Sequence, residues 1–312
     1  MALFRVPSGR VSWEVGGTRS PPRPRGPRRQ RVFRERKGCL LKIRVVGPGH
    51  LLFAAGLAGL GVLSLGSGDF ALNWQPVPAW VPWREILARA SGLLLLACGI
   101  GMLLKRTAIR CALVMAAYML SWVVVLQCPR AAAAPGDLGV WLGVSESVVL
   151  MTGGWMVFAS LAGPREKSRL RFVTGDRGAR LARLLFGLAC LVLGLSHFVY
   201  AETTAGMVPA WLPSRFFFAY LTGAGHLAAG LGVLSGVLPR LAATMEAGMI
   251  SLFVLLVHIP GVVSAPGSRL QWTMLFVASA LAGAVWAIAR SLQDASWGWA
   301  RAARIATRAT PA

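Results

Sequence analysis

Long apolar segments recur along the chain, and the short connections between them carry most of the charge. Each segment is close to the roughly 20 residues that an α-helix needs to cross the hydrocarbon core of a bilayer. Most are apolar on all faces, as expected of a helix surrounded by lipid or by other helices. The pattern predicts an all-α polytopic membrane protein with about eight transmembrane helices, over residues 49–68, 85–104, 108–128, 140–162, 183–201, 216–237, 241–260 and 270–290.

An internal repeat divides these segments into two groups of four. The sequence VPAWVP at residues 77–82 recurs as VPAWLP at residues 208–213, an offset of 131 residues. The same offset aligns further residues in separate segments: Arg84 with Arg215, Gly92 with Gly223, Pro129 with Pro260 and Trp141 with Trp272. We infer a duplicated four-helix unit. Because four is an even number of spans, both copies are expected to have the same orientation, as two parallel repeats.

Charge and composition complete the division of the chain. A basic tail that we expect to be disordered precedes the first unit, a basic linker joins the two units, and a second tail ends the chain. The corresponding boundaries are 1–48, 49–162, 163–182, 183–290 and 291–312. Only 14% of the residues are charged, against roughly 25% in an average soluble domain. This composition disfavours a soluble fold.

The distribution of Lys and Arg predicts the orientation of the helices. Outside the first tail, 15 of these residues lie on one side of the expected membrane and four on the other. By the positive-inside rule, the tails and the linker are then cytoplasmic. The expected partners are the lipid bilayer and, for the Arg-rich tail, anionic lipid headgroups. Nucleic acid is disfavoured because the tail is tethered to a membrane and has few stacking aromatics.

The first tail has an alternative origin. It is rich in Arg, Pro and Gly and contains little that would form a core. The alternative is an over-long gene prediction, with the true start of translation near Leu41 or Val45.

Each unit carries its V-P-A-W-x-P segment just outside the first span. The paired prolines prevent the helix from continuing, and tryptophan is typical of the interface between membrane and water. We therefore interpret Pro78 and Trp80, and likewise Pro209 and Trp211, as parts of rigid interfacial loops. The alternative is a lid that controls the access of a ligand.

Ionisable residues inside the spans are the candidates for chemistry, because they are costly in hydrocarbon and tend to face a bundle interior or a cavity. From their depths, His197, His226 and His258 are expected to line one outward-opening cavity in the second unit. Imidazole suits hydrogen bonding to a quinone, haem ligation and proton transfer. No H-x-x-x-H or E-x-x-H spacing supports a metal site, so none is expected. The alternative is that each histidine only bonds neighbouring helices.

Two further expectations concern charged residues. Arg89 and Glu146 lie at similar depths in the first unit, so they are expected to form an intramembrane ion pair. The alternative is that Arg89 reaches outward to water and Glu146 bonds to Ser or Thr neighbours. Glu246 lies near the cytoplasmic end of its span, where an ion pair with the nearby Arg240, or a carboxylate that reaches outward to water, is a sufficient explanation. The five cysteines include no C-x-x-C pair, so neither a disulfide framework nor a thiol relay is expected.

Several motifs of the second unit carry a resemblance to a known family. They are GLSHF at 194–198, MVPAWLP at 207–213, YLTGAGHLAAG at 220–230 and PRLA at 239–242. Through them residues 182–290 resemble the DoxX family of small four-helix membrane proteins, and residues 50–162 resemble it more weakly. Some members are similar to subunits of thiosulfate:quinone oxidoreductase or to partners of membrane-associated oxidoreductase complexes. The resemblance implies an accessory or structural component of such a system, with oxidoreductase subunits as partners, in a bacterial inner membrane.

Two other functions stay open at this stage. One is a redox subunit that binds quinone or haem among the three histidines, and the other is a transporter of small solutes built on the parallel repeats. The sequence contains no Walker A motif, nucleophile elbow or catalytic triad pattern. We therefore expect no catalytic activity of the chain on its own.

Overall fold

The computed structural model describes residues 47–295. Most of the first predicted tail and most of the last one therefore lie outside the described residues. Within the described range the chain is helical and has no strand. Eight of its helical segments are long and apolar enough to cross a membrane. The all-α, polytopic class and the eight spans that the sequence predicts are confirmed.

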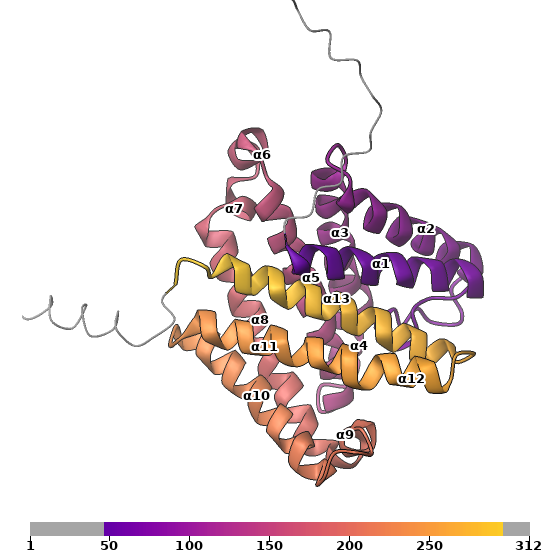
Figure 1. Cartoon of the computed structure of the whole chain (residues 1–312). Helices are drawn as coiled ribbons and strands as arrows, with labels where there is room; N and C mark the ends of the chain where they lie inside the picture. Colours follow the sequence, from indigo (N-terminus) through magenta and orange to yellow (C-terminus); the bar gives the residue numbers. More distant parts are fainter. Residues whose placement is uncertain (1–46, 296–312) are drawn as a thin grey trace, which may run out of the picture. The chain divides into compact units, whose positions relative to one another are not determined.

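The eight spans fall into two groups, with short helices in the connections (Figure 1). The first unit contains α1 (Pro48–Ser67), α2 (Arg84–Leu103), α3 (Ala108–Ser121) with its continuation α4 (Cys128–Ala133), and α5 (Leu138–Leu161). The second contains α8 (Asp176–Val199), α10 (Arg215–Ser235), α11 (Pro239–Phe253) with its continuation α12 (Ile259–Ser264), and α13 (Arg269–Ser291). The short elements are a 3-10 helix (Leu72–Trp74), α6 (Pro164–Arg169), α7 (Arg171–Thr174) and α9 (Ala201–Met207).

The fifth span begins earlier than the apolar pattern predicts. Helix α8 starts at Asp176, whereas the apolar segment begins at residue 183. The added turns carry Arg177, Arg180 and Arg183, whose long side chains reach polar surroundings while their stems cover apolar neighbours. Helices α6, α7 and the start of α8 therefore occupy most of the segment that the sequence presents as a linker.

The third span of each unit contains a π-helical turn. These turns cover Trp122–Gln127 and Val254–His258, and each ends shortly before a proline, Pro129 or Pro260. Proline has no N–H to donate, and its ring clashes with the carbonyl one turn earlier. A wider turn accommodates the ring within a helix that has to remain hydrogen-bonded in lipid.

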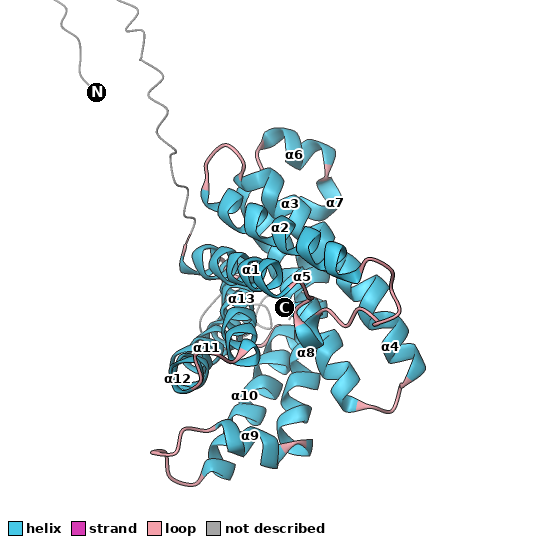
Figure 2. Ribbon diagram, turned by 90° about the vertical axis from the view of Figure 1, so that its right-hand side faces the viewer, coloured by secondary structure: helices cyan, strands magenta, loops and turns pink. Residues whose placement is uncertain are grey.

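The two units exchange packing partners. Helix α1 lies along α13, the last helix of the second unit, and α8 lies along α5, the last helix of the first unit. Helices α5 and α13 also contact each other. Figure 1 shows α1 beside α13, and Figure 2 shows the same pair from the side. Each unit therefore completes its helix packing with a helix of the other.

Glycines allow α1 and α13 to approach closely. A Cβ placed on Gly56 would lie 2.6 Å from the backbone nitrogen of Ala280, and one on Gly49 would lie 2.9 Å from the carbonyl oxygen of Gly283. A Cβ on Gly283 would in turn overlap the backbone of Phe53. Small residues at such positions are the usual basis of helix association in membranes.

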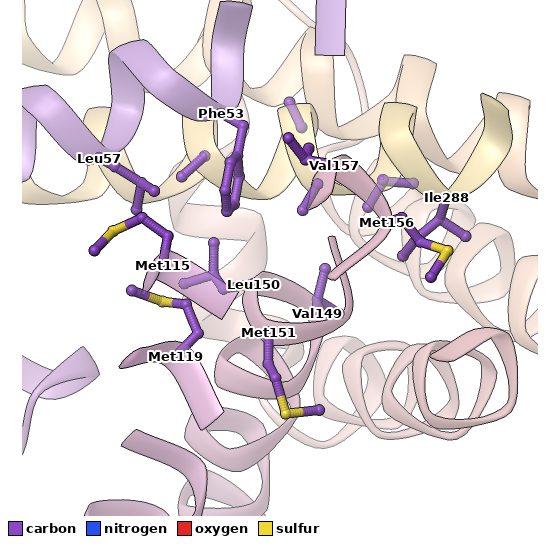
Figure 3. Packing of buried hydrophobic residues seen from close by; sticks show 14 of the residues in the cluster. Phe53, Leu57, Met115, Met119, Val149, Leu150, Met151, Met156, Val157 and Ile288 are labelled. Atoms are coloured by element: carbon purple, nitrogen blue, oxygen red, sulfur yellow. The ribbon is translucent and has the colours of Figure 1, made fainter. Parts of the chain in front are cut away.

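The buried core gathers around α5. Figure 3 shows Phe53 and Leu57 of α1 above Met115 and Met119 of α3, with Leu150 of α5 between them. All five side chains are completely buried. Methionine adapts its flexible side chain to irregular gaps between helices, which suits a core formed where three helices meet.

An ion cluster at one end of the bundle ties the first unit to α13. Asp69, in the connection after α1, accepts from Arg84 of α2 and from Nη1 of Arg269 of α13, the latter at 3.1 Å. It also accepts from the Phe70 N–H at 2.8 Å. Burial raises the pKa of the Asp69 carboxyl, but the bonds from Arg269, the Phe70 N–H and Arg84 outweigh that effect and hold the pKa below its usual value.

The close contact between α1 and α13 predicts that a larger side chain at Gly283 lowers the stability of the fold. Gly283→Val should lower the free energy of unfolding by about 1–3 kcal/mol, because backbone atoms of α1 cannot move aside as a flexible side chain would. The measurement is thermal unfolding in detergent. The matched control is Gly248→Ala in α11, where an added Cβ meets no atom within 4 Å and stability should be unchanged or slightly higher. Equal effects of both changes would contradict the close contact.

The Asp69 cluster predicts a stability difference that depends on pH. Because the folded-state pKa is lowered, the ionised carboxylate stabilises the fold above its unfolded-state pKa of about 3.9, and that contribution is lost as the pH falls through the folded-state value. Asp69→Asn should therefore lower the melting temperature at neutral pH, and the difference from the unaltered protein should shrink in acid. Glu202→Gln on the exposed surface of α9 should give no such convergence.

Candidate functional site

A cavity of about 940 Å³ lies within the second unit. Its wall is formed by α10, α11 and α13, by the segment from α9 to α10, and by single residues of α5 and α8. Most lining side chains are apolar, among them Met249, Leu252, Phe253 and Leu281. Polar groups occur in few places on this wall. A cavity of this size with few polar groups is typical of a small-molecule site.

The central polar feature is a pair of buried side chains. Nδ1 of His226 on α10 and Oε1 of Glu246 on α11 are 2.6 Å apart, and both residues are almost completely buried. Glu246 lines the cavity, and its second oxygen, Oε2, has no hydrogen-bond partner among the described residues. A buried carboxylate oxygen without a partner is costly. The pair therefore offers an unfilled hydrogen-bonding position at the cavity wall.

His197 of α8 extends this polar group toward the cavity. Its ring lies edge-on to that of His226, with centroids 4.9 Å apart, and its Nδ1 is 2.9 Å from the Thr222 hydroxyl. The Thr222 hydroxyl donates to the Phe218 carbonyl at 2.9 Å, so its oxygen is placed to accept a hydrogen bond from Nδ1–H of His197. That tautomer leaves Nε2 of His197 as an acceptor.

The polar group continues behind the pair to α8. The Cys190 thiol, which is fully buried, lies 4.0 Å from Oε1 of Glu246. Helices α8, α10 and α11 thus each contribute at least one polar side chain to one connected group. Hydrogen-bonded groups of this kind are able to relay a proton between a ligand and the helix interior.

Two further ionisable residues line the cavity from other directions. His258 lies in the π-helical turn after α11, and its Nδ1 has no hydrogen-bond partner in the described part of the chain. Glu146 comes from α5 of the first unit and also lines the cavity. The three histidines that the sequence singles out therefore lie at or directly behind one cavity. Their role as ligand-binding residues stays a prediction.

The expected ion pair between Arg89 and Glu146 is absent from the described residues. Arg89 instead binds Glu85 one turn earlier on α2, at 2.6 Å, and both side chains are more than half exposed. A carboxylate at position i−4 is within reach whatever the tertiary packing. Equal depth did not bring Arg89 and Glu146 together, because depth says nothing about which face of each helix carries the residue.

Glu246 is a candidate functional residue that the sequence analysis did not include, because a structural role was a sufficient explanation. Its expected partner was Arg240, whose Nη1 donates instead to the Gln293 carbonyl at 2.8 Å. Helix α11 is long enough to place Glu246 inside the bundle rather than at its end. The available signal was the presence of a carboxylate and of His226 in neighbouring apolar spans, where each is costly alone.

The two interfacial loops differ in their relation to the cavity. Pro209 and Trp211 line it, although Trp211 is 70% exposed. Pro78 and Trp80 occur in the corresponding loop of the first unit, and neither is among the residues that line the cavity. Of these two loops, the second therefore covers part of the cavity in the second unit, as a lid would, and the first does not.

The first unit is filled where the second is polar. At the offset of 131, His226 and Glu246 correspond to Leu95 and Met115, both fully buried. Phe253 corresponds to Trp122, which is 2% exposed. The same scaffold therefore packs with apolar side chains at both positions. His226 and Glu246 are not needed to hold such a unit together.

The described residues contain no group of three or more His, Cys, Asp or Glu that would hold a metal ion. The cysteines with described structure, Cys98, Cys111, Cys128 and Cys190, are free thiols. The polar side chains that line the cavity include imidazole, carboxylate and hydroxyl groups.

Comparison with known proteins identifies one family. The DoxX family model matches residues 178–259, which run from the start of α8 through the π-helical turn that contains His258. The match includes His197, His226, Glu246 and His258, and it does not extend to the first unit. No curated protein and no solved structure matches the chain. The chain carries a DoxX domain at residues 178–259, within a polytopic membrane protein whose described part has eight helices long and apolar enough to cross a membrane.

Proposed function

We propose that the chain binds a lipophilic ligand of the quinone class in the cavity of the second unit, as an accessory component of a membrane-associated oxidoreductase system. The observation that carries the proposal is the buried pair of His226 and Glu246, whose Oε2 is unpartnered at the wall of an otherwise apolar cavity. A quinone carbonyl accepts hydrogen bonds and a quinol hydroxyl donates them. The site offers both kinds of partner.

The apolar part of the wall suits the hydrophobic portion of such a ligand. Leu221, Met245 and Leu252 line the cavity and are also at least half exposed on the surface of the helices. In a membrane-spanning chain, that surface faces acyl chains. A ligand dissolved in the bilayer would therefore enter between α10 and α11 without crossing water.

Haem is a less suitable occupant. Nδ1 of His226 is used by Glu246 and Nδ1 of His197 contacts Thr222, so an axial ligand would come from Nε2 of either ring or from His258. Such an axial bond would leave Oε2 of Glu246 without a partner. A quinone headgroup addresses the carboxylate directly.

We also propose that the two units arose by duplication. Helices α2 and α10, α3 and α11, and α5 and α13 start at positions separated by 131 residues. The indole nitrogens of Trp141 and Trp272 donate to the carbonyls of Pro135 and Pro266, at 2.9 and 2.8 Å. These equivalences support a common origin, in which the second unit acquired or retained the ligand site.

Solute transport is the second candidate function. Thr244 of α11 lines the large cavity and also a separate pocket of about 580 Å³ at the opposite end of the helix. The two spaces thus approach each other at Thr244. A conformational change there would join them into a path through the second unit, as transport of a solute requires.

The orientation of the helices is part of the proposal, with both termini cytoplasmic in a bacterial inner membrane. Cysteines introduced near Gly136 and Gly267 should react with a membrane-impermeant thiol reagent in intact cells. Cysteines near Ser168 and Thr307 should react only after the membrane is permeabilised. The basis is the excess of Lys and Arg in the connections that hold the latter pair. Labelling at Ser168 in intact cells would contradict this orientation.

The ligand proposal is tested with a variant that copies the first unit. His226→Leu with Glu246→Met introduces the residues found at Leu95 and Met115, so it is expected to fold. A short-chain benzoquinone should raise the melting temperature of the unaltered protein, and the variant should bind it about tenfold more weakly or worse, since hydrogen bonds to charged groups contribute roughly 1.5–3 kcal/mol. Glu202→Gln removes an exposed carboxylate outside the cavity and should bind normally. Equal stabilisation of all three proteins would refute the proposal.

A further inference from the structure

A second pocket lies at the end of the bundle where α1 begins and α13 ends. It has a volume of about 580 Å³ and is bounded by the ends of α1, α5, α8, α11 and α13. Three arginines from three helices line it, Arg183 of α8, Arg240 of α11 and Arg290 of α13. Asp294 is the one acidic residue among the lining residues of this described pocket. The balance of charge around the pocket is therefore positive.

The arginines are held in place by the backbone around the pocket. Arg183 donates from Nε to the Ser291 hydroxyl at 3.1 Å, and from Nη2 to the Ser291 carbonyl. Arg240 donates to the Gln293 carbonyl at 2.8 Å. Both arginines thus bind carbonyl groups at or just after the C-terminal end of α13, where carbonyls lack intrahelical partners. The guanidinium groups are gathered at one place rather than spread over the surface.

Helix polarity adds to this positive potential. Helix α1 begins at the pocket, and its N-cap, Gly47, provides no side-chain cap for the first N–H groups. Helix α11 also begins there, again without a side-chain cap. The N-terminus of a helix carries partial positive charge and favours anions. The two helix termini and the three arginines therefore all favour an anion in this pocket.

Part of the remaining wall of the pocket is apolar. Met156 and Val157 of α5 and Trp286 and Ala287 of α13 form this part. Because these helices span the membrane, the pocket lies where lipid headgroups meet acyl chains. A pocket with a cationic rim and an apolar wall at that depth matches an amphiphile whose anionic group is attached to a hydrocarbon chain.

We propose that this pocket binds the phosphate headgroup of an anionic phospholipid, with Arg183, Arg240 and Arg290 as phosphate ligands. Arginine pairs with phosphate oxygens through two parallel hydrogen bonds. A headgroup without a cation of its own is favoured over a zwitterionic one, because the arginines repel that cation. The bound lipid bridges α8, α11 and α13, and so stabilises the second unit at the end opposite the quinone cavity. The proposal does not depend on the ligand of the large cavity.

The test compares two pairs of arginines at the same end of the bundle. Delipidated full-length protein in detergent is titrated with phosphatidylglycerol, with phosphatidylcholine or with inorganic phosphate, and thermal unfolding is followed. Phosphatidylglycerol should stabilise the protein at lower concentration than phosphatidylcholine. Arg240→Gln with Arg290→Gln should weaken that effect about tenfold or more, as expected for lost charge-assisted bonds. Arg106→Gln with Arg110→Gln removes two exposed charges, one in the connection between α2 and α3 and one in the first turn of α3, and should change little.

The outcomes separate specific binding from general charge. Equal weakening in both variants would assign the effect to surface charge and overturn the proposal. Equal stabilisation by the two lipids would overturn it as well. An effect of inorganic phosphate with none from phosphatidylglycerol would assign the pocket to free phosphate and reject the lipid. If the Gln variant unfolds without lipid, Arg240→Lys with Arg290→Lys keeps the charge and should keep the preference for phosphatidylglycerol.

Discussion

The close approach of α1 to α13 is the contact on which the rest of the fold depends. Apolar side chains gain little by leaving lipid for protein, so helices in a membrane associate where small residues let the backbones approach. Gly49, Gly56 and Gly283 provide such a surface, and none of the three has room for a Cβ. Gly153 of α5 fits equally closely against Ala284 on another face of α13. Helix α13 is therefore fixed between α1 and α5.

This position of α13 joins the two units into one packing system. The first helix of each unit relies on the last helix of the other, and Asp69 adds an ionic contact between the first unit and Arg269. The cavity inherits this arrangement, because α13 supplies part of its wall and α5 supplies Glu146. A ligand in the second unit is thus in contact with side chains from both. The site would be incomplete in an isolated second unit.

The sequence predicts what depends on position along a helix and fails where rotation about the helix axis decides. Apolar length located all eight spans to within a few residues, except at α8, where arginines continue the helix beyond its apolar part. The sequence assigned His197 and His226 to one cavity, and the centroids of their rings are 4.9 Å apart. The same reasoning failed for Arg89, whose carboxylate partner is its own neighbour Glu85.

Glu246 illustrates the same limit from the other direction. Its position along α11 was known. The pattern of polar residues did not reveal that its side chain points toward His226 of α10 and not toward Arg240. Only a helical face shared with His226 makes the pair possible, and a membrane helix that is apolar on all sides gives no periodic signal for that face. Packing glycines such as Gly223 and Gly230, which bring α10 against α8, were the more informative marks of orientation.

The difference between the two units bears most directly on function. Leu95, Met115 and Trp122 are buried at the corresponding positions of the first unit, so the scaffold packs there without the ionisable pair. Burying His226 and Glu246 costs solvation that their single hydrogen bond only partly restores, and Oε2 of Glu246 is left unpartnered. Departures from good packing of this kind concentrate at functional sites. Because the first unit packs apolar side chains at the corresponding positions, packing alone does not explain the pair, and this difference supports the ligand site proposed above.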